Sequence, residues 1–249
     1  MTADTNSSAR IAALLKRIRA NVRDNVAQRQ TYLNPLEQAI TPLRNNTIIV
    51  GACPSLDERK HELPELQKNG ASIICMMRAL KCIYGLLDPD AVVILEPADV
   101  FNDYHLMATV KTPLVCGLGA NPELVQSWPG PVFATLPFSE PEMDEYSKKT
   151  GLPQINCFNS TLGYLVMMCR ILRIFPEYIG CDFWFTKDKY YAEPYTDKPP
   201  AEDRVIRDLR YPAESGRLTS QWLVQMLAYL GQIEPFYILN REKLKAMVV

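Results

Sequence analysis

Histidine is the scarcest chemically informative residue of this chain. The 249 residues include two, His61 and His105. Zinc and similar transition-metal centres usually draw several ligands from imidazole groups, so a histidine-rich metal site is excluded. We therefore nominate no metal-ligating residue.

Long apolar runs are missing too. No stretch approaches the ~18 apolar residues that a helix needs to cross a bilayer, and residues 1–8 lack the charged-then-apolar order of a secretory signal. The seven cysteines are an odd number without a C-x-x-C pair. Most lie in apolar runs, where a thiol behaves as a small hydrophobe. These absences predict a cytoplasmic protein.

An excess of charge of one sign is also absent, because the formal net charge at pH 7 is −1. Surfaces that bind nucleic acid or anionic membranes normally carry an excess of lysine and arginine. We therefore expect neither nucleic acid nor a membrane as a partner.

Residues 7–33 read as an amphipathic helix. Its apolar side chains recur at the helical spacing of three to four residues, at Ile11, Leu14, Leu15, Ile18 and Val22. We expect a helical extension over residues 1–45 and an α/β domain over residues 46–249. The apolar stripe either packs on that domain or pairs two chains into a homo-oligomer.

From residue 46 onward, short β-rich runs alternate with helical patterns. The runs cover residues 47–50, 72–76, 91–95, 113–116, 132–136, 178–181 and 236–239. The clearest helical patterns cover residues 162–174 and 218–230. Near-continuous apolar strands separated by helices indicate a mostly parallel, Rossmann-like sheet with helices on both faces. Residues 186–216 lack hydrophobic periodicity, which is typical of a lid or a disordered loop.

The first of these strands breaks into a turn that contains glycine, proline and a hydroxyl, and a helix-compatible segment over 57–66 follows. A strand, a small-residue turn and a helix in this order bring backbone N–H groups to one point, which is how many α/β proteins hold phosphate. The predicted phosphate-binding residues are Gly51, Ala52, Cys53, Pro54 and Ser55. A nucleophilic role for the cysteine would lack a histidine partner other than His61.

Ligands of open parallel sheets bind beyond the carboxyl ends of the strands, so residues that follow the other strands are also candidates. They are the charged residues Arg78, Glu96 and Asp182, the helix-start residues Asn159, Ser160 and Thr161, and Gly180, Lys187, Tyr190 and Tyr191.

Several of these candidates have an ordinary structural interpretation as well. Asn159 or Ser160 fits a helix N-cap. Arg78 fits a surface ion pair, and Asp182 fits a turn cap. Glu96 is a stronger candidate for a functional role, because a carboxylate at the end of a buried strand costs free energy unless it is paired with a cation, hydrated or part of a functional site.

Residues 51–56, Gly-Ala-Cys-Pro-Ser-Leu, resemble the G-x-G-P-S-L turn of the MptE-like family. This family is named for archaeal 6-hydroxymethylpterin diphosphokinase and includes the Maf flagellin-modification proteins, which are associated with transfer of nonulosonic sugars. A similar turn opens the bacterial sialyltransferases of the Campylobacter type. Residues 75–97 resemble the family's Arg-Ala-Leu, Pro-Asp and acid-Pro pattern, and residues 159–192 resemble its second block, with Gly-x-Asp and Tyr-Ala. The resemblance covers residues 45–195.

The chain departs from the family pattern at three points. Cys53 stands where the family has its second glycine. The pterin diphosphokinases carry acidic residues for Mg²⁺ where this chain has Met77, Arg78 and Glu96, which leaves one acid. The sialyltransferases use a downstream histidine, which Asp182, Asp188 or a tyrosine would have to replace here.

The resemblance implies a transferase that binds a nucleotide-activated donor, most simply a nucleotide sugar. In this interpretation Arg78 stabilises the departing phosphate, and Asp182 or Glu96 acts as general base. Residues 186–216, with Lys187, Tyr190 and Tyr191, close over the donor. One alternative is an ATP-dependent diphosphokinase of the pterin type, with Mg²⁺ as cofactor. The other is a catalytically inactive binding or assembly module. The sequence does not specify the acceptor.

Overall fold

A computed structural model describes residues 3–28, 31–36, 46–138, 140–155, 160–197, 205–208, 210–220, 223–226, 228 and 230. Six parallel strands form the central sheet: β1 (Thr47–Val50), β2 (Ser72–Met76), β3 (Ala91–Ile94), β4 (Leu114–Gly117), β5 (Val132–Thr135) and β6 (Glu177–Ile179). Their order is β5-β4-β3-β2-β1-β6. The predicted parallel α/β fold is therefore confirmed. The predicted strand over 236–239 lies outside the described residues.

Both faces of the sheet are buried, because successive strand residues point to opposite sides. Ile48 and Val50 belong to one hydrophobic cluster, whereas Ile49 belongs to the other. The first cluster includes residues of α2 (Leu56–Arg59), α3 (Leu63–Lys68), α4 (Met77–Ile83), α5 (Pro122–Ser127) and α6 (Pro141–Thr150). The second includes residues of α7 (Thr161–Ile171) and of the stretch 223–230. Short 3₁₀ helices lie at η1 (Lys60–Glu62), η2 (Asn102–Met107) and η3 (Ala213–Ser215).

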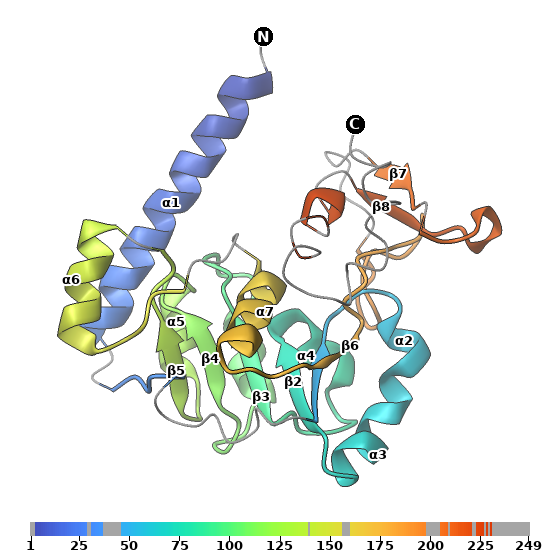
Figure 1. The fold of residues 1–249 in the computed structure, drawn as a ribbon, viewed down its shortest axis with the longest axis horizontal. Coiled ribbons are helices and arrows are strands. Elements are labelled where there is room, and N and C mark those ends of the chain that lie inside the picture. Colours follow the sequence, from blue (N-terminus) through green and yellow to red (C-terminus); the bar gives the residue numbers. More distant parts are fainter. Residues whose placement is uncertain are drawn as a thin grey trace.

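The long helix α1 (Ala3–Gln28) packs on the domain through its second half and extends beyond it at its amino-terminal end (Figure 1). Val22 is fully buried, and the carboxamide of Asn25 donates to the carbonyls of Leu118 and Ala120 at 2.8 and 3.0 Å. The predicted helix over 7–33 was wrong at both ends. At the carboxyl side, Leu33 is extended because it exchanges backbone hydrogen bonds with the strand β5.

A two-stranded antiparallel ribbon, β7 (Val205–Arg207) and β8 (Leu218–Ser220), lies beside the carboxyl ends of the sheet (Figure 1). The predicted helix over 218–230 was therefore wrong at its start. Leu218 exchanges two backbone hydrogen bonds with Phe185, at 2.9 and 2.7 Å. The first helical residue that the structure describes after β8 is Leu223, whose backbone N–H donates to the Ser220 hydroxyl at 3.3 Å. Within the described ranges, no helix is long and apolar enough to cross a membrane.

Candidate functional site at the strand ends

β6 lies on the opposite side of β1 from β2, which places the topological switch point between β1 and β6. A cavity of about 270 Å³ lies at the carboxyl ends of these strands. We call it the strand-end cavity. It is lined by residues that follow β1, β2, β3 and β6, by the first residues of α7 and by two residues of the last helical stretch. They include Ala52, Cys53, Arg78, Glu96, Ser160, Thr161, Trp184, Tyr190, Tyr191 and Leu223.

A larger hollow of about 670 Å³ lies at the opposite edge of the sheet, lined by residues such as Ser72, Asp90 and Pro113 that precede or begin the strands. None of the residues nominated from the sequence lines it. The strand-end cavity is therefore the candidate site, because it gathers the charged and polar groups.

Gly51 and Gly180 hold the backbones after β1 and β6 in direct contact. A Cβ atom on Gly51 would lie 2.3 Å from the Gly180 carbonyl oxygen, and one on Gly180 would lie 2.4 Å from the Gly51 carbonyl oxygen. Gly180 also has a φ of +69°, a conformation that side chains disfavour. Both glycines are thus required by packing between the two strand ends.

Two N–H groups of the predicted phosphate-binding turn are engaged inside the fold. Gly51 donates to the Ile179 carbonyl at 2.8 Å, and Cys53 donates to the Gly180 carbonyl at 3.0 Å. The Cys53 thiol sulfur accepts the Phe183 N–H at 3.3 Å, and burial raises the pKa of this thiol well above its usual range. Ala52 and Cys53 line the cavity, whereas Pro54 and Ser55 do not.

Arg78 is the cation of the strand-end cavity. Its guanidinium carbon lies 4.3 Å from the ring centre of Tyr191, 5.2 Å from that of Phe101 and 5.4 Å from that of Tyr195. Across the described part of the chain, no carboxylate forms an ion pair with Arg78. A guanidinium that stacks on rings without an acidic partner keeps its donors available for an anionic ligand.

The amino terminus of α7 opens into the same cavity. Ser160 is the N-cap, and its hydroxyl accepts the Gly163 N–H at 3.2 Å. Ser160 and Thr161 both line the cavity, next to the partial positive charge that a helix amino terminus carries. Asn159 lies outside the described residues.

Glu96 follows β3 and is the one carboxylate among the described residues that line the cavity. One of its oxygens accepts the Ala98 N–H at 3.0 Å. No group of three or more histidine, cysteine or acidic side chains that could hold a metal ion occurs within the described ranges. The described residues therefore do not build a metal site of their own. A Mg²⁺ ion would have to arrive largely coordinated by phosphate and water, with Glu96 as a protein ligand.

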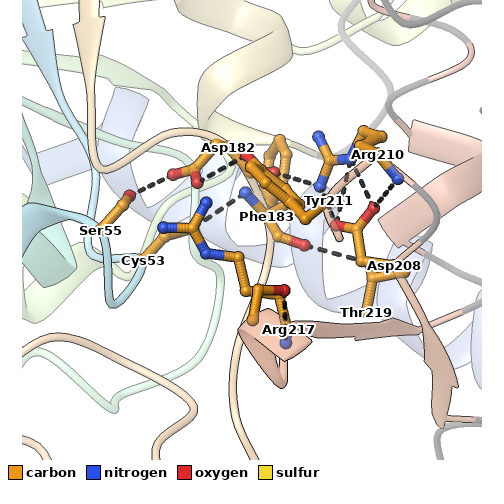
Figure 2. Close-up of polar contacts among 10 residues, drawn as sticks. Cys53, Ser55, Asp182, Phe183, Asp208, Arg210, Tyr211, Arg217 and Thr219 are labelled. Carbon is orange, nitrogen blue, oxygen red and sulfur yellow. Dashed lines mark hydrogen bonds and ion pairs between the residues drawn. The ribbon is translucent and has the colours of Figure 1, made fainter. Parts of the chain in front are cut away.

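Asp182, the third predicted catalytic residue, does not line the cavity. Its carboxylate accepts hydrogen bonds from the Ser55 hydroxyl and, at 3.3 Å, from the Tyr211 hydroxyl (Figure 2). Its backbone carbonyl accepts from Arg210 at 2.6 Å. Burial raises the pKa of the Asp182 carboxyl, and the Ser55 hydrogen bond partly opposes that rise. Asp182 thus joins the turn after β1 to the segment that carries the ribbon.

A buried ion pair anchors that segment. Arg210 and Asp208 have side chains that are 5% and 0% exposed, and their closest atoms are 2.6 Å apart (Figure 2). Burial lowers the pKa of Arg210, but the hydrogen bonds and charge of Asp208 raise it above its ordinary value. Burial and the nearby Asp182 raise the pKa of Tyr211 to about 12, so its hydroxyl stays protonated as a donor.

The predicted lid residues divide into two groups. Tyr190 and Tyr191 line the cavity, whereas Lys187 is exposed and does not.

The segment is tied to α2, because Asp57 accepts from Lys189 at 2.7 Å, from Lys60 at 2.6 Å and from the Glu193 N–H at 3.1 Å. The Ala192 N–H also donates to the Ala52 carbonyl at 2.8 Å. We call residues 189–193 the strap.

Sequence reasoning nominated Tyr190 and Tyr191 but missed the other aromatic residues that line the cavity and the anchoring group of Arg210 and Tyr211. Residues 183–195 include six aromatic side chains, Phe183, Trp184, Phe185, Tyr190, Tyr191 and Tyr195. This density was the available signal for the aromatic lining. No comparable signal marked Asp208 and Arg210, because their spacing does not show that the pair is buried or that Arg210 reaches the Asp182 carbonyl, 28 residues away.

A parallel sheet with its cavity at the switch point places the chain in the doubly wound α/β class, whose members bind ligands beyond the strand ends. The family model described as "6-hydroxymethylpterin diphosphokinase MptE-like" matches residues 16–188. The chain belongs to this family, as the resemblance predicted. The link to Campylobacter-type sialyltransferases stays a prediction.

Among solved structures, the MAf glycosyltransferase from Magnetospirillum magneticum AMB-1 is similar, with a TM-score of 0.60 and 17% sequence identity. The alignment covers 89% of this chain and 34% of that chain. The two share a fold, and this chain spans about a third of the glycosyltransferase. A comparison with curated proteins gives no match.

Proposed function

We propose that the chain is a nucleotide-dependent transferase that takes a nucleotide-activated sugar as donor. The observation that carries this proposal is Arg78, a cation stacked on aromatic rings and without an acidic partner among the described residues. It lines the same cavity as the amino terminus of α7. Family membership and the shared fold with a glycosyltransferase support the same interpretation.

In the proposed reaction, an acceptor hydroxyl oxygen attacks the anomeric carbon of the donor sugar. The bond between that carbon and the phosphate oxygen breaks, and its electron pair leaves with the phosphate. Arg78 and the amino terminus of α7 stabilise the departing negative charge. Glu96 accepts the hydroxyl proton, because it is the cavity's carboxylate among the described residues. Asp182 holds the ribbon segment instead of acting as base.

The family's name supports an alternative, an ATP-dependent diphosphokinase. Pyrophosphoryl transfer from ATP relies on Mg²⁺ to neutralise the phosphates, and Glu96 is the acid that this cavity offers. A catalytically inactive binding module is the other alternative, supported by Cys53 at the position of a family glycine.

A thermal-shift panel separates the three functions. The purified chain is heated with CMP, UDP, GDP, ATP or GTP, each with Mg²⁺ and with EDTA. A ligand at a hundredfold excess over its Kd stabilises the native state by about 2.7 kcal/mol, which moves the midpoint by several degrees. Stabilisation by CMP or UDP that survives EDTA supports the sugar transferase. A shift with ATP that needs Mg²⁺ replaces it with the diphosphokinase, and no shift at all favours the inactive module.

A further inference from the structure

Two tyrosine hydroxyls lie next to the aromatic rings that surround Arg78. The Tyr195 hydroxyl donates to the Arg78 backbone carbonyl at 2.9 Å. A phenol has one proton to donate, so Tyr104 is the donor in the hydrogen bond between the Tyr104 and Tyr195 hydroxyls. Burial raises the pKa of both phenols, and both protons are therefore present at neutral pH. Neither tyrosine lines the strand-end cavity, so a role in binding has to act through a residue that does.

The rings and the two hydroxyls form a closed loop of contacts around the Arg78 guanidinium. Phe101 meets Tyr104 edge-on, with ring centres 5.0 Å apart. Tyr191 meets Tyr195 edge-on, with ring centres 5.7 Å apart. The guanidinium lies over Phe101 and Tyr191, which both line the cavity. The hydrogen bond between Tyr104 and Tyr195 joins the two halves of the loop, one from the chain after β3 and the other from the chain after β6.

Tyr195 contacts Arg78 at both ends of that residue. Its hydroxyl holds the backbone carbonyl, and its ring centre lies 5.4 Å from the guanidinium carbon. Ordering a long, flexible side chain when a ligand binds costs affinity, and a side chain that its neighbours already hold avoids this cost. Arg19 is oriented differently, because both of its hydrogen bonds go to the Glu140 carboxylate, which neutralises its charge. Tyr195 orients Arg78 without adding a negative charge.

We propose that Tyr195 is a positioning residue of the strand-end cavity and that Tyr104 supports it by donating to its hydroxyl. Together they hold the Arg78 guanidinium against the rings of Phe101 and Tyr191, where it meets the anionic group of the nucleotide. This inference rests on the proposed function. The two tyrosines thus contribute to affinity without touching the ligand.

The first test is a double-mutant cycle on the full chain, with calorimetric titration of CMP and of UDP. Tyr195→Phe keeps the ring and removes both hydrogen bonds of the hydroxyl. We expect it to weaken binding roughly two- to tenfold, the cost of ordering one long side chain on binding. In an Arg78→Met background the same substitution should change the affinity little, because Tyr195 acts through Arg78. An equal loss in both backgrounds is what a merely structural role predicts, and it overturns the proposal.

Tyr32→Phe is the matched control for the loss of a tyrosine hydroxyl. The Tyr32 hydroxyl also donates to a backbone carbonyl at 2.9 Å, that of Asn25, and Tyr32 does not line the cavity. We expect its nucleotide affinity to be unchanged. A loss as large as that of Tyr195→Phe would assign the effect to general loosening of the fold and would contradict the role of Tyr195.

The second test needs no nucleotide. The side-chain Nε–H signal of Arg78 is followed by NMR in ¹⁵N-labelled chain and is assigned by its loss in Arg78→Met. Protons above the faces of aromatic rings are shielded, so we expect this signal upfield of the signals of exposed arginines. Tyr195→Phe should move it toward them. A signal that stays in place overturns the positioning role.

The two tests separate this inference from the function beneath it. If neither CMP nor UDP binds but the Arg78 signal moves in Tyr195→Phe, Tyr195 still holds Arg78 and the transferase proposal fails. If nucleotide binds and the signal stays in place, the positioning role fails and the transferase proposal remains. The signal also decides where Arg78→Met binds too weakly for the cycle. Should Tyr195→Phe not fold, Tyr104→Phe replaces it, since that variant keeps the hydrogen bond from Tyr195 to the Arg78 carbonyl.

Discussion

At the scale of single residues, Arg78 differs in its neighbours from three other arginines of the chain. Arg19, Arg59 and Arg210 all have carboxylate partners, whereas Arg78 has the rings of Tyr191, Phe101 and Tyr195 (Figure 1 locates α4, which carries it). Ring faces orient a guanidinium without neutralising it. The positive charge of Arg78 therefore remains available for an anionic ligand.

Arg78→Met should lower nucleotide affinity at least tenfold, because a hydrogen bond to a charged group contributes about 1.5–3 kcal/mol. The midpoint of thermal unfolding without ligand should change little. Calorimetric titration measures the affinity. Lys81→Met is the matched control, since Lys81 is an exposed cation over Tyr195 at 5.4 Å that does not line the cavity. Equal losses in the two variants would show a general charge effect and would contradict the assignment.

Gly180→Ala should destabilise the fold by about 3 kcal/mol or more. Its Cβ would meet the Gly51 carbonyl at 2.4 Å, and overpacking adds to the cost of a positive φ. Gly70→Ala is the control, because Gly70 also has a positive φ, of +91°, but nothing lies within 4 Å of its Cβ. There we expect a loss of about 1 kcal/mol. Urea denaturation compares the two, and similar losses would mean that the close contact relaxes easily.

At the scale of elements, the strap is fastened to α2 by one carboxylate. Burial raises the pKa of Asp57, but the hydrogen bonds from Lys189 and Lys60 and from the Glu193 N–H lower it below its ordinary value. A carboxyl with a depressed pKa contributes stability above its unfolded pKa of about 3.9 and loses that contribution as the pH falls through the lower, folded value. The strap should therefore loosen in acid.

We expect hydrogen exchange of residues 189–193, corrected for its intrinsic pH dependence, to accelerate as the pH falls below about 4. Asp57→Asn should already exchange fast at neutral pH and lose most of the pH dependence. Mass spectrometry of peptides that cover the strap gives both rates. The central strand β3, whose residues 91–94 are all buried, serves as an internal reference. If the hydrogen-exchange rate of the strap is the same in Asp57→Asn as in the unsubstituted chain, the role assigned to Asp57 is contradicted.

The strands could be predicted from the sequence because each is a short apolar run bounded by turn residues, as in Ile48, Ile49 and Val50 before Gly51. β8 could not. Leu218 begins a pattern with helical spacing, but its backbone pairs with Phe185 and with β7. Those partners are remote in sequence, so tertiary pairing overrode the local preference.

The candidate site was predictable to the extent that it follows from topology. Arg78 and Glu96 each follow a parallel strand, and strand ends meet at one edge. The direction in which the Asp182 side chain points was not predictable. It follows a strand as well, but it hydrogen-bonds Ser55 and Tyr211, and the latter belongs to a segment without a hydrophobic pattern.

At the scale of the whole molecule, α1 connects the start of the chain to the loop after β4. Asn25 is fully buried and bridges two carbonyls of that loop, and Asn21 bridges the carbonyls of Pro97 and Gly119, both at 2.9 Å. The sequence predicted the apolar stripe of this helix but not whether the stripe packs on the domain or on another chain. These carboxamides attach the second half of α1 to the domain.

Asn25→Ala should destabilise the fold by about 1–3 kcal/mol, because two buried carbonyls lose their donor. Asn34→Ala is the control, since both hydrogen bonds of the Asn34 carboxamide are exposed: it donates to the Gly151 carbonyl at 3.0 Å and accepts the Leu36 N–H at 2.9 Å. Its loss should cost about 1 kcal/mol or less. Guanidinium denaturation measures both, and an unaffected Asn25→Ala would mean that α1 is not part of the cooperative fold.

The contact between Gly51 and Gly180 has a consequence for how this family can diverge. When a substitution introduces a larger side chain that collides with a neighbouring side chain, a second mutation can replace that neighbour with a smaller residue. Here each glycine faces the other's main-chain carbonyl, which no codon change removes. A substitution at the facing glycine therefore cannot relieve the collision, and selection for folding keeps both glycines whether or not the chain catalyses anything. An active transferase and a silent descendant would carry the same two glycines.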